Sequence, residues 1–247
     1  PIPEDVRKAD QVPANEHLTM QIAESVFNIQ TAANALIFFQ DNQPAYITKR
    51  FDYKPDGTKF GMEDFASIAD KKRETHGVDF KYDASYEELF RLLKQHVGPY
   101  TVEAQKLFRL ILFSYAFSNG DAHLKNFSLI EADGADYILA PAYDLLNSRI
   151  HVNDQDVALK NGLFDEYETE SFEKNAFYAY DDFFELGKRV ELSEAFVRAE
   201  IKLFITNSED VSDFVARSFL DDSAKAKYLE LYNDKLKRLS YSYRKLI

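Results

Sequence analysis

The sequence predicts an α+β protein with a small N-terminal part that carries a β-hairpin and a larger, mostly helical C-terminal part. Two runs rich in β-branched and aromatic residues, 35–39 and 45–51, flank a polar turn, which is typical of a hairpin. A second pair of runs, 127–130 and 137–139, flanks an Asp-Gly turn. From about residue 150 onward, the pattern is mostly helical.

Helical patterns are expected before, between and after the hairpins. In the first, Leu18, Ile22 and Val26 are spaced four residues apart on one face. In another, Ser85 is followed three residues later by Glu88, the spacing of a capping box. The strongest pattern ends at Ser-Asn-Gly, which favours a helix stop. The expected helices cover 15–26, 63–72, 86–97, 101–117, 180–190, 193–206, 209–219 and 224–243.

Composition narrows the class of protein. The 247 residues include 42 acidic and 30 basic side chains, for a net charge of −12, which argues against direct nucleic-acid binding over a broad basic face. The sequence has no cysteine, which excludes disulfides, zinc–thiolate sites and thiol nucleophiles. No apolar run reaches the roughly 18 residues of a membrane helix, so no membrane partner is expected. Together these features predict a cytoplasmic protein.

The segment 121–126 contains four side chains of kinds that take part in catalysis or metal binding. It holds Asp121, His123, Lys125 and Asn126 between the strongest predicted helix and the second hairpin. Asp144 follows the second strand of that hairpin, eighteen residues after Asn126. Because hairpin strands lie about 4.8 Å apart, we expect Asp121, Asn126 and Asp144 to meet at one end of the hairpin.

Oxygen-bearing side chains at one place suit a magnesium ion, which takes oxygen ligands and substrate phosphates. A second carboxylate, away from the metal, can accept a proton from an attacking hydroxyl. In protein kinases the catalytic Asp precedes the metal-binding Asn by five positions, as Asp121 precedes Asn126. The alternative is structural: Asp121 caps a turn, Asn126 takes a left-handed conformation and Asp144 caps a helix.

These motifs resemble those of HipA-type toxin kinases. Residues 119–128, Asn-Gly-Asp-Ala-His-Leu-Lys-Asn-Phe-Ser, resemble the catalytic loop of that family, and 139–145, Leu-Ala-Pro-Ala-Tyr-Asp-Leu, resemble its metal-binding segment. Segments 15–20, 48–52 and 63–65 are similar to the family in the expected order. The resemblance covers nearly all of residues 10–190.

The resemblance implies a two-lobed protein-kinase-like fold, with an incomplete N-lobe and hinge over 1–56 and a helical C-lobe over 57–247. It also implies a Ser/Thr protein kinase of a toxin–antitoxin system, with ATP and Mg²⁺ as cofactors. A protein substrate and a DNA-binding antitoxin would be its partners.

The same resemblance implies roles for eight residues. Asp121 would be the catalytic base, and His123 would contact the phosphates. Asn126 and Asp144 would bind Mg²⁺. On the nucleotide side, Tyr143 would lie against the adenine ring, the backbone of Lys49 and Phe51 would contact the adenine edge, and Asp52 would contact the ribose.

Other interpretations of these residues stay open. His123 could be an ordinary loop histidine, Tyr143 a core residue, Asp52 a turn cap, and Lys49 a solvated charge. Lys125 is expected to pair with a nearby acid rather than with substrate. Glu16, near the start of the first helix, could mirror the kinase glutamate that orients the ATP lysine.

The sequence departs from a complete kinase in two respects. It has 8 glycines and no glycine-rich loop before the hinge, and no strand lysine precedes the first helix. In the family those parts lie just upstream of the segment that Pro1 begins. The alternatives to an active protein kinase are therefore a catalytically incomplete domain that binds nucleotide or antitoxin, and a small-molecule phosphotransferase.

Overall fold

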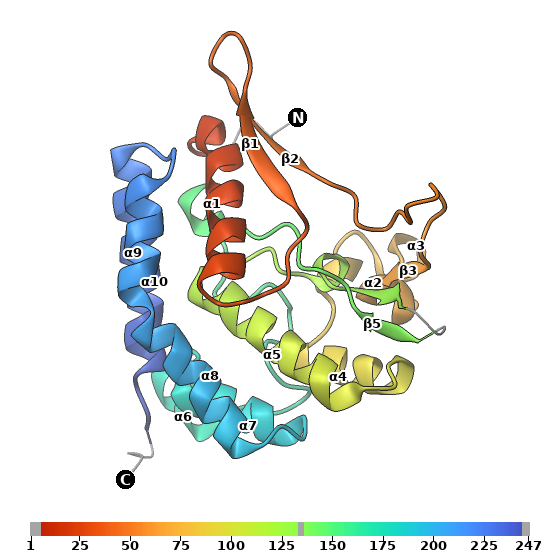
Figure 1. The fold of residues 1–247 in the computed structure, drawn as a ribbon. Coiled ribbons are helices and arrows are strands. Elements are labelled where there is room, and N and C mark those ends of the chain that lie inside the picture. The colour runs from red at the N-terminus through yellow and green to blue at the C-terminus, as the bar shows by residue number, and fades with distance from the viewer. Residues whose placement is uncertain (1–5, 133–135, 244–247) are drawn as a thin grey trace.

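The computed structural model describes residues 6–132 and 136–243, and it confirms the α+β class (Figure 1). The N-terminal part consists of helix α1 (Val12–Ser25) and the hairpin of β1 (Asn34–Phe38) and β2 (Pro44–Thr48). The two strands are antiparallel, with Asn34 opposite Thr48 and Phe38 opposite Pro44. Figure 1 shows the hairpin projecting from the rest of the molecule beside α1.

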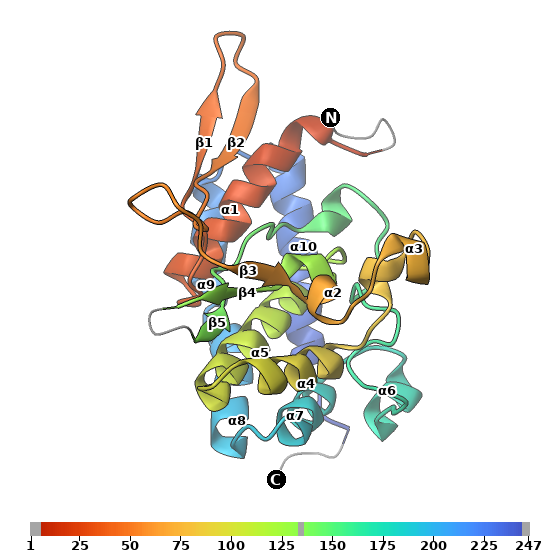
Figure 2. The same ribbon diagram turned by 90° about the vertical axis from the view of Figure 1, so that its right-hand side faces the viewer.

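The second predicted hairpin is present as β4 (Ser128–Glu131) and β5 (Tyr137–Leu139). Its expected Asp-Gly turn lies outside the described residues. A third strand, β3 (Met62–Asp64), pairs with β4 and completes a sheet of order β3-β4-β5. Figure 2 shows this sheet between the hairpin above it and helices α4 and α5 below it.

The prediction of one helix over 63–72 was wrong at both ends. Residues 62–64 pair with β4 instead. The carboxylate of Asp64 accepts a hydrogen bond from the Ser67 N–H at 2.8 Å, so the helix begins at Phe65, and it ends at Ile68. Two short helices follow, α2 (Phe65–Ile68) and α3 (Arg73–His76).

The longer predicted helices are confirmed within a few residues. In α4 (Tyr86–His96), the hydroxyl of Ser85 accepts the hydrogen bond of the Glu88 N–H at 3.1 Å, as the capping motif predicted. The C-terminal helix ends at Leu239, before the expected residue 243, and the short α6 was not predicted. The remaining helices are α5 (Tyr100–Ala116), α6 (Glu170–Asn175), α7 (Tyr180–Arg189), α8 (Glu194–Thr206), α9 (Ser208–Arg217) and α10 (Asp222–Leu239).

Helix α5 runs through the middle of the molecule, with the β3-β4-β5 sheet to one side and α9 and α10 to the other (Figure 1). Aromatic rings join these layers. Phe27 stacks on Phe204 at 4.2 Å between ring centroids, Phe113 on Phe117 at 4.2 Å, and Phe117 on Tyr232 at 4.8 Å. This packing fixes the C-terminal end of α5, which leads directly into segment 119–126.

The N-terminal part is tied to the chain that follows β5. The Ala32 N–H donates to the Ala142 carbonyl, and the Ala142 N–H donates to the Gln30 carbonyl, both at 2.8 Å. These bonds place the hairpin next to Tyr143 and Asp144. In the described ranges, no helix combines the length and apolar character that crossing a membrane requires.

Candidate active site

The structure brings together a side chain that precedes the first strand of the second hairpin and one that follows its second strand. Asn126 donates from Nδ2 to Oδ2 of Asp144 at 2.6 Å. Burial raises the pKa of the Asp144 carboxyl, and the nearby charge of Asp121 raises it further. Asn126 and Asp144 therefore meet as expected, and Asp121 lies near enough for its charge to act on Asp144.

Local backbone bonds hold segment 119–126 in shape. The Gly120 N–H donates to the hydroxyl of Ser148 at 2.8 Å, which anchors the start of the segment. The His123 N–H donates to the Asp121 carbonyl at 2.8 Å and to Oδ1 of Asn126 at 3.1 Å. Because both ends of the Asn126 amide are bonded, its orientation is fixed.

Asp144, not Asn126, takes the left-handed conformation, with φ of 59°. A non-glycine residue at such an angle is uncommon and is found where the surroundings fix it. Asn126 instead closes a single 3₁₀ turn over Leu124–Asn126. The structural alternative for Asn126 is therefore wrong as it was stated.

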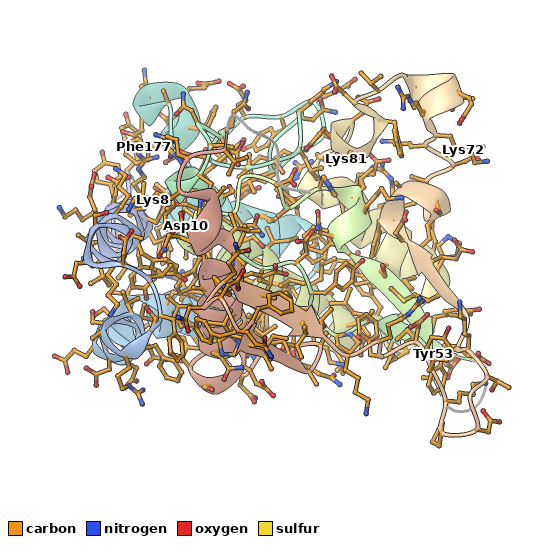
Figure 3. The ribbon with its side chains drawn as sticks, turned by 90° about the horizontal axis from the view of Figure 1, so that it is seen from above. Lys8, Asp10, Tyr53, Lys72, Lys81 and Phe177 are labelled. Carbon is orange, nitrogen blue, oxygen red and sulfur yellow. The ribbon has the colours of Figure 1, made fainter. Side chains whose placement is uncertain are left out.

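Two residues that the sequence analysis did not single out lie against Asp121. The hydroxyl of Tyr82 donates to Oδ1 of Asp121 at 2.5 Å, and Nζ of Lys81 lies 3.9 Å from the same oxygen. Both belong to a 3₁₀ turn over Phe80–Tyr82, which carries no motif that could have identified them. In Figure 3, Lys81 lies among the other side chains, whereas Lys72 and Tyr53 lie at the periphery.

His123 is buried and uncharged at neutral pH. Burial lowers its pKa to about 4, and Lys81 adds to that effect, while the charge of Asp121 opposes it. Its Nε2 lies 2.7 Å from Nζ of Lys81 and accepts from that ammonium, which leaves the ring proton on Nδ1. Among the described residues, Nδ1 has no hydrogen-bond partner. His123 therefore holds Lys81 beside Asp121.

Lys125 pairs with an acid, as predicted. Its Nζ lies 3.3 Å from Oδ2 of Asp64, the residue that caps α2. This ion pair directs Lys125 toward the β3-β4-β5 sheet.

The side chains proposed for adenine contact lie next to each other. The rings of Phe51 and Tyr143 are 5.8 Å apart between centroids, with 33° between their planes. The Tyr143 hydroxyl donates to the Lys125 carbonyl at 2.8 Å and lies 2.7 Å from the Ser128 hydroxyl. Both rings are half-buried, so the pair offers a fixed apolar surface beside Asp144.

The segment 49–52 leaves some of its polar groups available. The Lys49 N–H donates to the Ala33 carbonyl at 2.7 Å, so Lys49 could offer an adenine only its carbonyl oxygen. Arg50 donates from Nε to Oδ1 of Asp52 at 2.9 Å and from Nη2 to Oδ2 at 2.5 Å. These hydrogen bonds lower the pKa of the Asp52 carboxyl. The Asp52 carboxylate would therefore share a ribose contact with Arg50.

Glu16 of α1 also faces this place. Burial raises its pKa to about 8, and the charge of Asp144 contributes. Glu16 is therefore mostly protonated at neutral pH, and a cation bound near Asp144 would favour its ionised form.

The donor set fits Mg²⁺. The described ranges hold no group of three or more Asp, Glu, His or Cys side chains able to hold a metal by themselves. Magnesium does not need one, because it is commonly bound by one or two protein oxygens together with substrate phosphates and water. Asp144 would supply one protein oxygen, and the Asn126 amide oxygen, which here accepts from the His123 N–H while Nδ2 faces Asp144, would supply the other after the amide turns over.

Comparisons with known proteins identify the family of this chain and its relatives. A family model described as "HipA-like C-terminal domain" matches residues 3–211. A Haemophilus influenzae protein named "Putative kinase" is 26% identical over 92% of this chain and 70% of its own length. A Sinorhizobium fredii protein named "Putative kinase Y4dM" is 35% identical over 62% of this chain and 34% of its own.

Two solved structures share the fold. One is a chain of the Shewanella oneidensis MR-1 toxin–antitoxin complex of HipA, HipB and operator DNA, with a TM-score of 0.71 and 20% identity. The match covers 95% of this chain and 57% of that one. The other is the Helicobacter pylori proinflammatory kinase CtkA, with a TM-score of 0.63, 14% identity, and 95% and 86% coverage. The fold is thus that of the HipA and CtkA kinases, and with its family model matched over most of its length, the chain belongs to the HipA-like C-terminal domain family.

Proposed function

We propose that this chain is the catalytic part of a protein kinase that transfers the γ-phosphate of ATP to a serine or threonine hydroxyl. The observation that carries the proposal is the hydrogen bond between Asn126 and Asp144 beside Asp121. In the sequence, Asp121, Asn126 and Asp144 follow the order of base, amide and metal-binding carboxylate in protein kinases, and the first two have the same spacing. The chain spans little more than half of the HipA chain that it matches, so the activity of a whole relative is part of this proposal.

The chemistry assigned to each residue follows from its place. Asp121 accepts the proton of the acceptor hydroxyl at Oδ1 as the hydroxyl oxygen bonds to the γ-phosphorus. The bond from that phosphorus to the bridging oxygen breaks, and ADP leaves. Asp144 and Asn126 would hold Mg²⁺, which when bound would neutralise charge on the phosphate oxygens.

Lys81 supplies a cation that the loop itself lacks. Protein kinases commonly carry a lysine two residues after the base, and this chain has the uncharged His123 there. The ammonium of Lys81, held by His123 at 2.7 Å, lies beside Asp121 and can meet the transferring phosphate. Phe51 and Tyr143 receive the adenine ring, with the Lys49 carbonyl at its edge and Asp52 at the ribose.

Partners and location follow from the same reasoning. The HipA neighbour is in a complex with HipB and operator DNA, which supports a DNA-binding antitoxin as a partner of this chain. The net charge of −12 suits a partner with a basic face. We place the protein in the cytoplasm, and the boundary between the two lobes near residue 56.

The test is phosphate transfer from labelled ATP to protein, with and without Mg²⁺. Asp121→Asn and Asp144→Asn are each expected to lower the rate by roughly 10²-fold or more. Asp41→Asn, at the exposed turn of the first hairpin, is the matched control. An Asp121→Asn protein that keeps its native unfolding temperature and transfers phosphate at the native rate would refute the proposal.

Two other outcomes separate the alternatives. If Mg²⁺–ATP raises the unfolding temperature but no phosphate appears on any protein, the chain is a nucleotide-binding domain without catalysis. If label appears only on small acceptors, it is a small-molecule phosphotransferase.

A further inference from the structure

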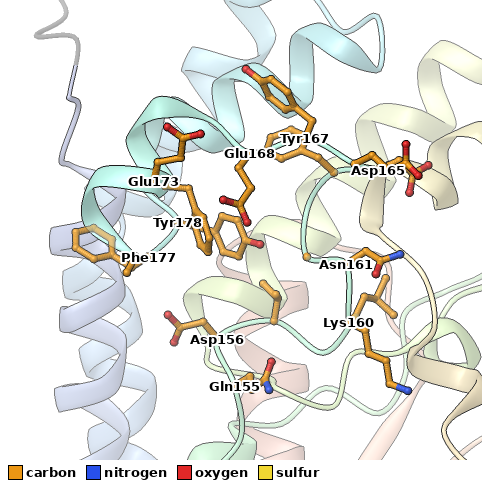
Figure 4. Close-up of a pocket in the computed structure, with 17 residues that line it drawn as sticks. Gln155, Asp156, Lys160, Asn161, Asp165, Tyr167, Glu168, Glu173, Phe177 and Tyr178 are labelled. Atoms are coloured by element: carbon orange, nitrogen blue, oxygen red, sulfur yellow. The ribbon is translucent and has the colours of Figure 1, made fainter.

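A large hollow lies beside the candidate active site and has no part in the chemistry described above. Its volume is about 1240 Å³, and its lining comes from the chain between Gln155 and Tyr178, including α6 (Figure 4). Figure 4 shows Glu168 and Tyr178 near its middle, with Asp156 and Phe177 to one side and Asn161 to the other. Small-molecule pockets are usually about 300–1,000 Å³ and largely closed, so this larger, open hollow suits a segment of polypeptide.

The hollow adjoins the loop that holds Asp121. The Lys160 N–H donates to the carbonyl of Tyr82 at 2.9 Å, and Tyr82 in turn reaches Asp121. On the other side, Gly120 packs so closely on this segment that an added Cβ would lie 2.8 Å from the Gln155 carbonyl oxygen. A polypeptide lying in the hollow could therefore present a nearby hydroxyl to Asp121.

The lining carries negative charge that the protein does not balance. Glu166, Glu168 and Glu173 are exposed, and within the described ranges none of them forms an ion pair. Three basic groups around the hollow, by contrast, are already paired. Nζ of Lys160 lies 3.6 Å from Oδ2 of Asp79. Nε of Arg189 lies 2.7 Å from Oε1 of Glu87, and Nη1 of Arg238 lies 2.5 Å from Oδ2 of Asp156.

Aromatic rings at the rim already receive guanidinium groups. The guanidinium of Arg189 lies over the ring of Tyr167 at 4.8 Å, and that of Arg238 lies over Phe177 at 5.1 Å. Such contacts stabilise a cation by roughly 0.5–1 kcal/mol at exposed sites. The rim thus combines aromatic faces with unbalanced carboxylates, a combination that complements arginine and lysine side chains.

We propose that this hollow binds an arginine- or lysine-bearing segment of the protein substrate while a serine or threonine of that substrate reaches Asp121. The inference rests on the proposed kinase function, and it adds the substrate class: proteins with basic residues flanking the acceptor.

The experiment measures peptide binding by fluorescence anisotropy in the absence of ATP. The probes are labelled peptides with a central serine and arginines on one side or the other, and matched peptides with glutamine in their place. The variant is Glu166→Gln, Glu168→Gln and Glu173→Gln combined. The control neutralises three exposed acids at the distant α9–α10 end: Glu209→Gln, Asp213→Asn and Asp222→Asn.

The native protein is expected to bind an arginine peptide roughly tenfold more tightly than its glutamine match, since three exposed charge pairs contribute a few tenths of a kcal/mol to 1 kcal/mol each. The hollow variant should lose that preference and the control should keep it. Equal affinity for the two peptides, or a preference that survives in the hollow variant, overturns the inference.

Phosphate transfer to the same peptides separates this inference from the function it rests on. Transfer without any arginine preference leaves the kinase function standing and removes the hollow as the substrate site. An arginine preference in binding, with no transfer by the native protein, removes the kinase function and leaves a peptide-binding site.

Discussion

The hydroxyl of Tyr82 donates to Oδ1 of Asp121 at 2.5 Å, and so occupies the position in which an acceptor hydroxyl would donate its proton. Burial raises the pKa of Tyr82 above its usual value, and the hydrogen bond to Asp121 adds to this, so the phenol stays protonated. In this arrangement one oxygen of the carboxylate is bonded to the protein itself, and a substrate hydroxyl that approaches Oδ1 competes with Tyr82 for it.

Tyr82→Phe is therefore expected to raise kcat/KM for a protein acceptor. A net hydrogen bond contributes about 0.5–1.5 kcal/mol, so its removal corresponds to a rise of roughly two- to tenfold. Steady-state phosphate transfer measures this, with Tyr241→Phe, an exposed tyrosine, as the control. A loss of activity would mean that Tyr82 orients Asp121 for catalysis rather than competing for it.

Lys81→Met tests the cation beside the base. Removing one charged donor from a transferring group costs on the order of a hundredfold in kcat, and we expect a loss between ten- and a hundredfold here. Lys81→Arg should retain most of the rate, because it keeps the charge. The affinity for ADP, which lacks the transferring phosphate, should stay the same, since Lys81 contacts His123 and Asp121 rather than the adenine side. Lys72→Met, at the periphery in Figure 3, should have no effect, and an active Lys81→Met protein would remove Lys81 from the mechanism.

Much of the site could be predicted because its residues come from short motifs joined by one hairpin. Asn126 and Asp144 meet because β4 and β5 pair, which the sequence indicated. Lys81 and Tyr82 could not be found in that way, because a turn outside any motif brings them to Asp121 through tertiary packing. The strand Met62–Asp64 was missed for a similar reason: three residues are too few to show an alternation, and their pairing with β4 decides their conformation.

Gly120→Ala should destabilise the protein through a steric clash. An added Cβ would collide with the Cβ of Asp154 and lie 2.8 Å from the Gln155 carbonyl oxygen, which is backbone and cannot turn away. Overpacking of this kind costs about 1–3 kcal/mol, and each kcal/mol lowers Tm by roughly 2–4 °C in a domain of this size. Gly98→Ala is the matched control, because only the Asp136 carboxylate oxygen, at 3.7 Å, would be near its Cβ. Equal Tm values for the two variants would show that segment 154–155 shifts without cost.

Asp156 ties the hollow to α10. Oδ1 of Asp156 lies 2.5 Å from Nζ of Lys235 and 2.9 Å from Nη1 of Arg149, and Oδ2 lies 2.5 Å from Nη1 of Arg238. The side chain of Lys235 is only 1% exposed. Asp156→Asn should cost about 3–5 kcal/mol of unfolding free energy, since it leaves a buried cation without its carboxylate. Adding Lys235→Met should recover part of the loss. Urea unfolding of the two single variants and the double variant measures the coupling, and additive effects would contradict the proposed ion pair.

His151 should make the fold sensitive to mild acid. It is 3% exposed, its Nε2 accepts from Nδ2 of Asn15 at 2.8 Å, and its Nδ1 donates to the Arg7 carbonyl at 2.9 Å. The Asn15 amide cannot reverse its orientation to accommodate a second ring proton, because Nδ2 also donates to the Asn147 carbonyl and Oδ1 accepts from the Asn147 N–H. The neutral ring is therefore the form that fits, and burial lowers the pKa of His151 below 6.5.

The sign of the pH effect follows from this direction. Between the lowered pKa of the folded state and the value of about 6.5 in the unfolded chain, the unfolded state binds more protons, so stability rises with pH and falls as the solution is acidified below about 6.5. Urea unfolding at a series of pH values should show this slope in the native protein and a shallower one in His151→Gln. His96→Gln, which alters an exposed histidine, should keep the native slope. Parallel curves for the native protein and His151→Gln would show that His151 takes up its proton without disturbing the bonds to Asn15 and Arg7.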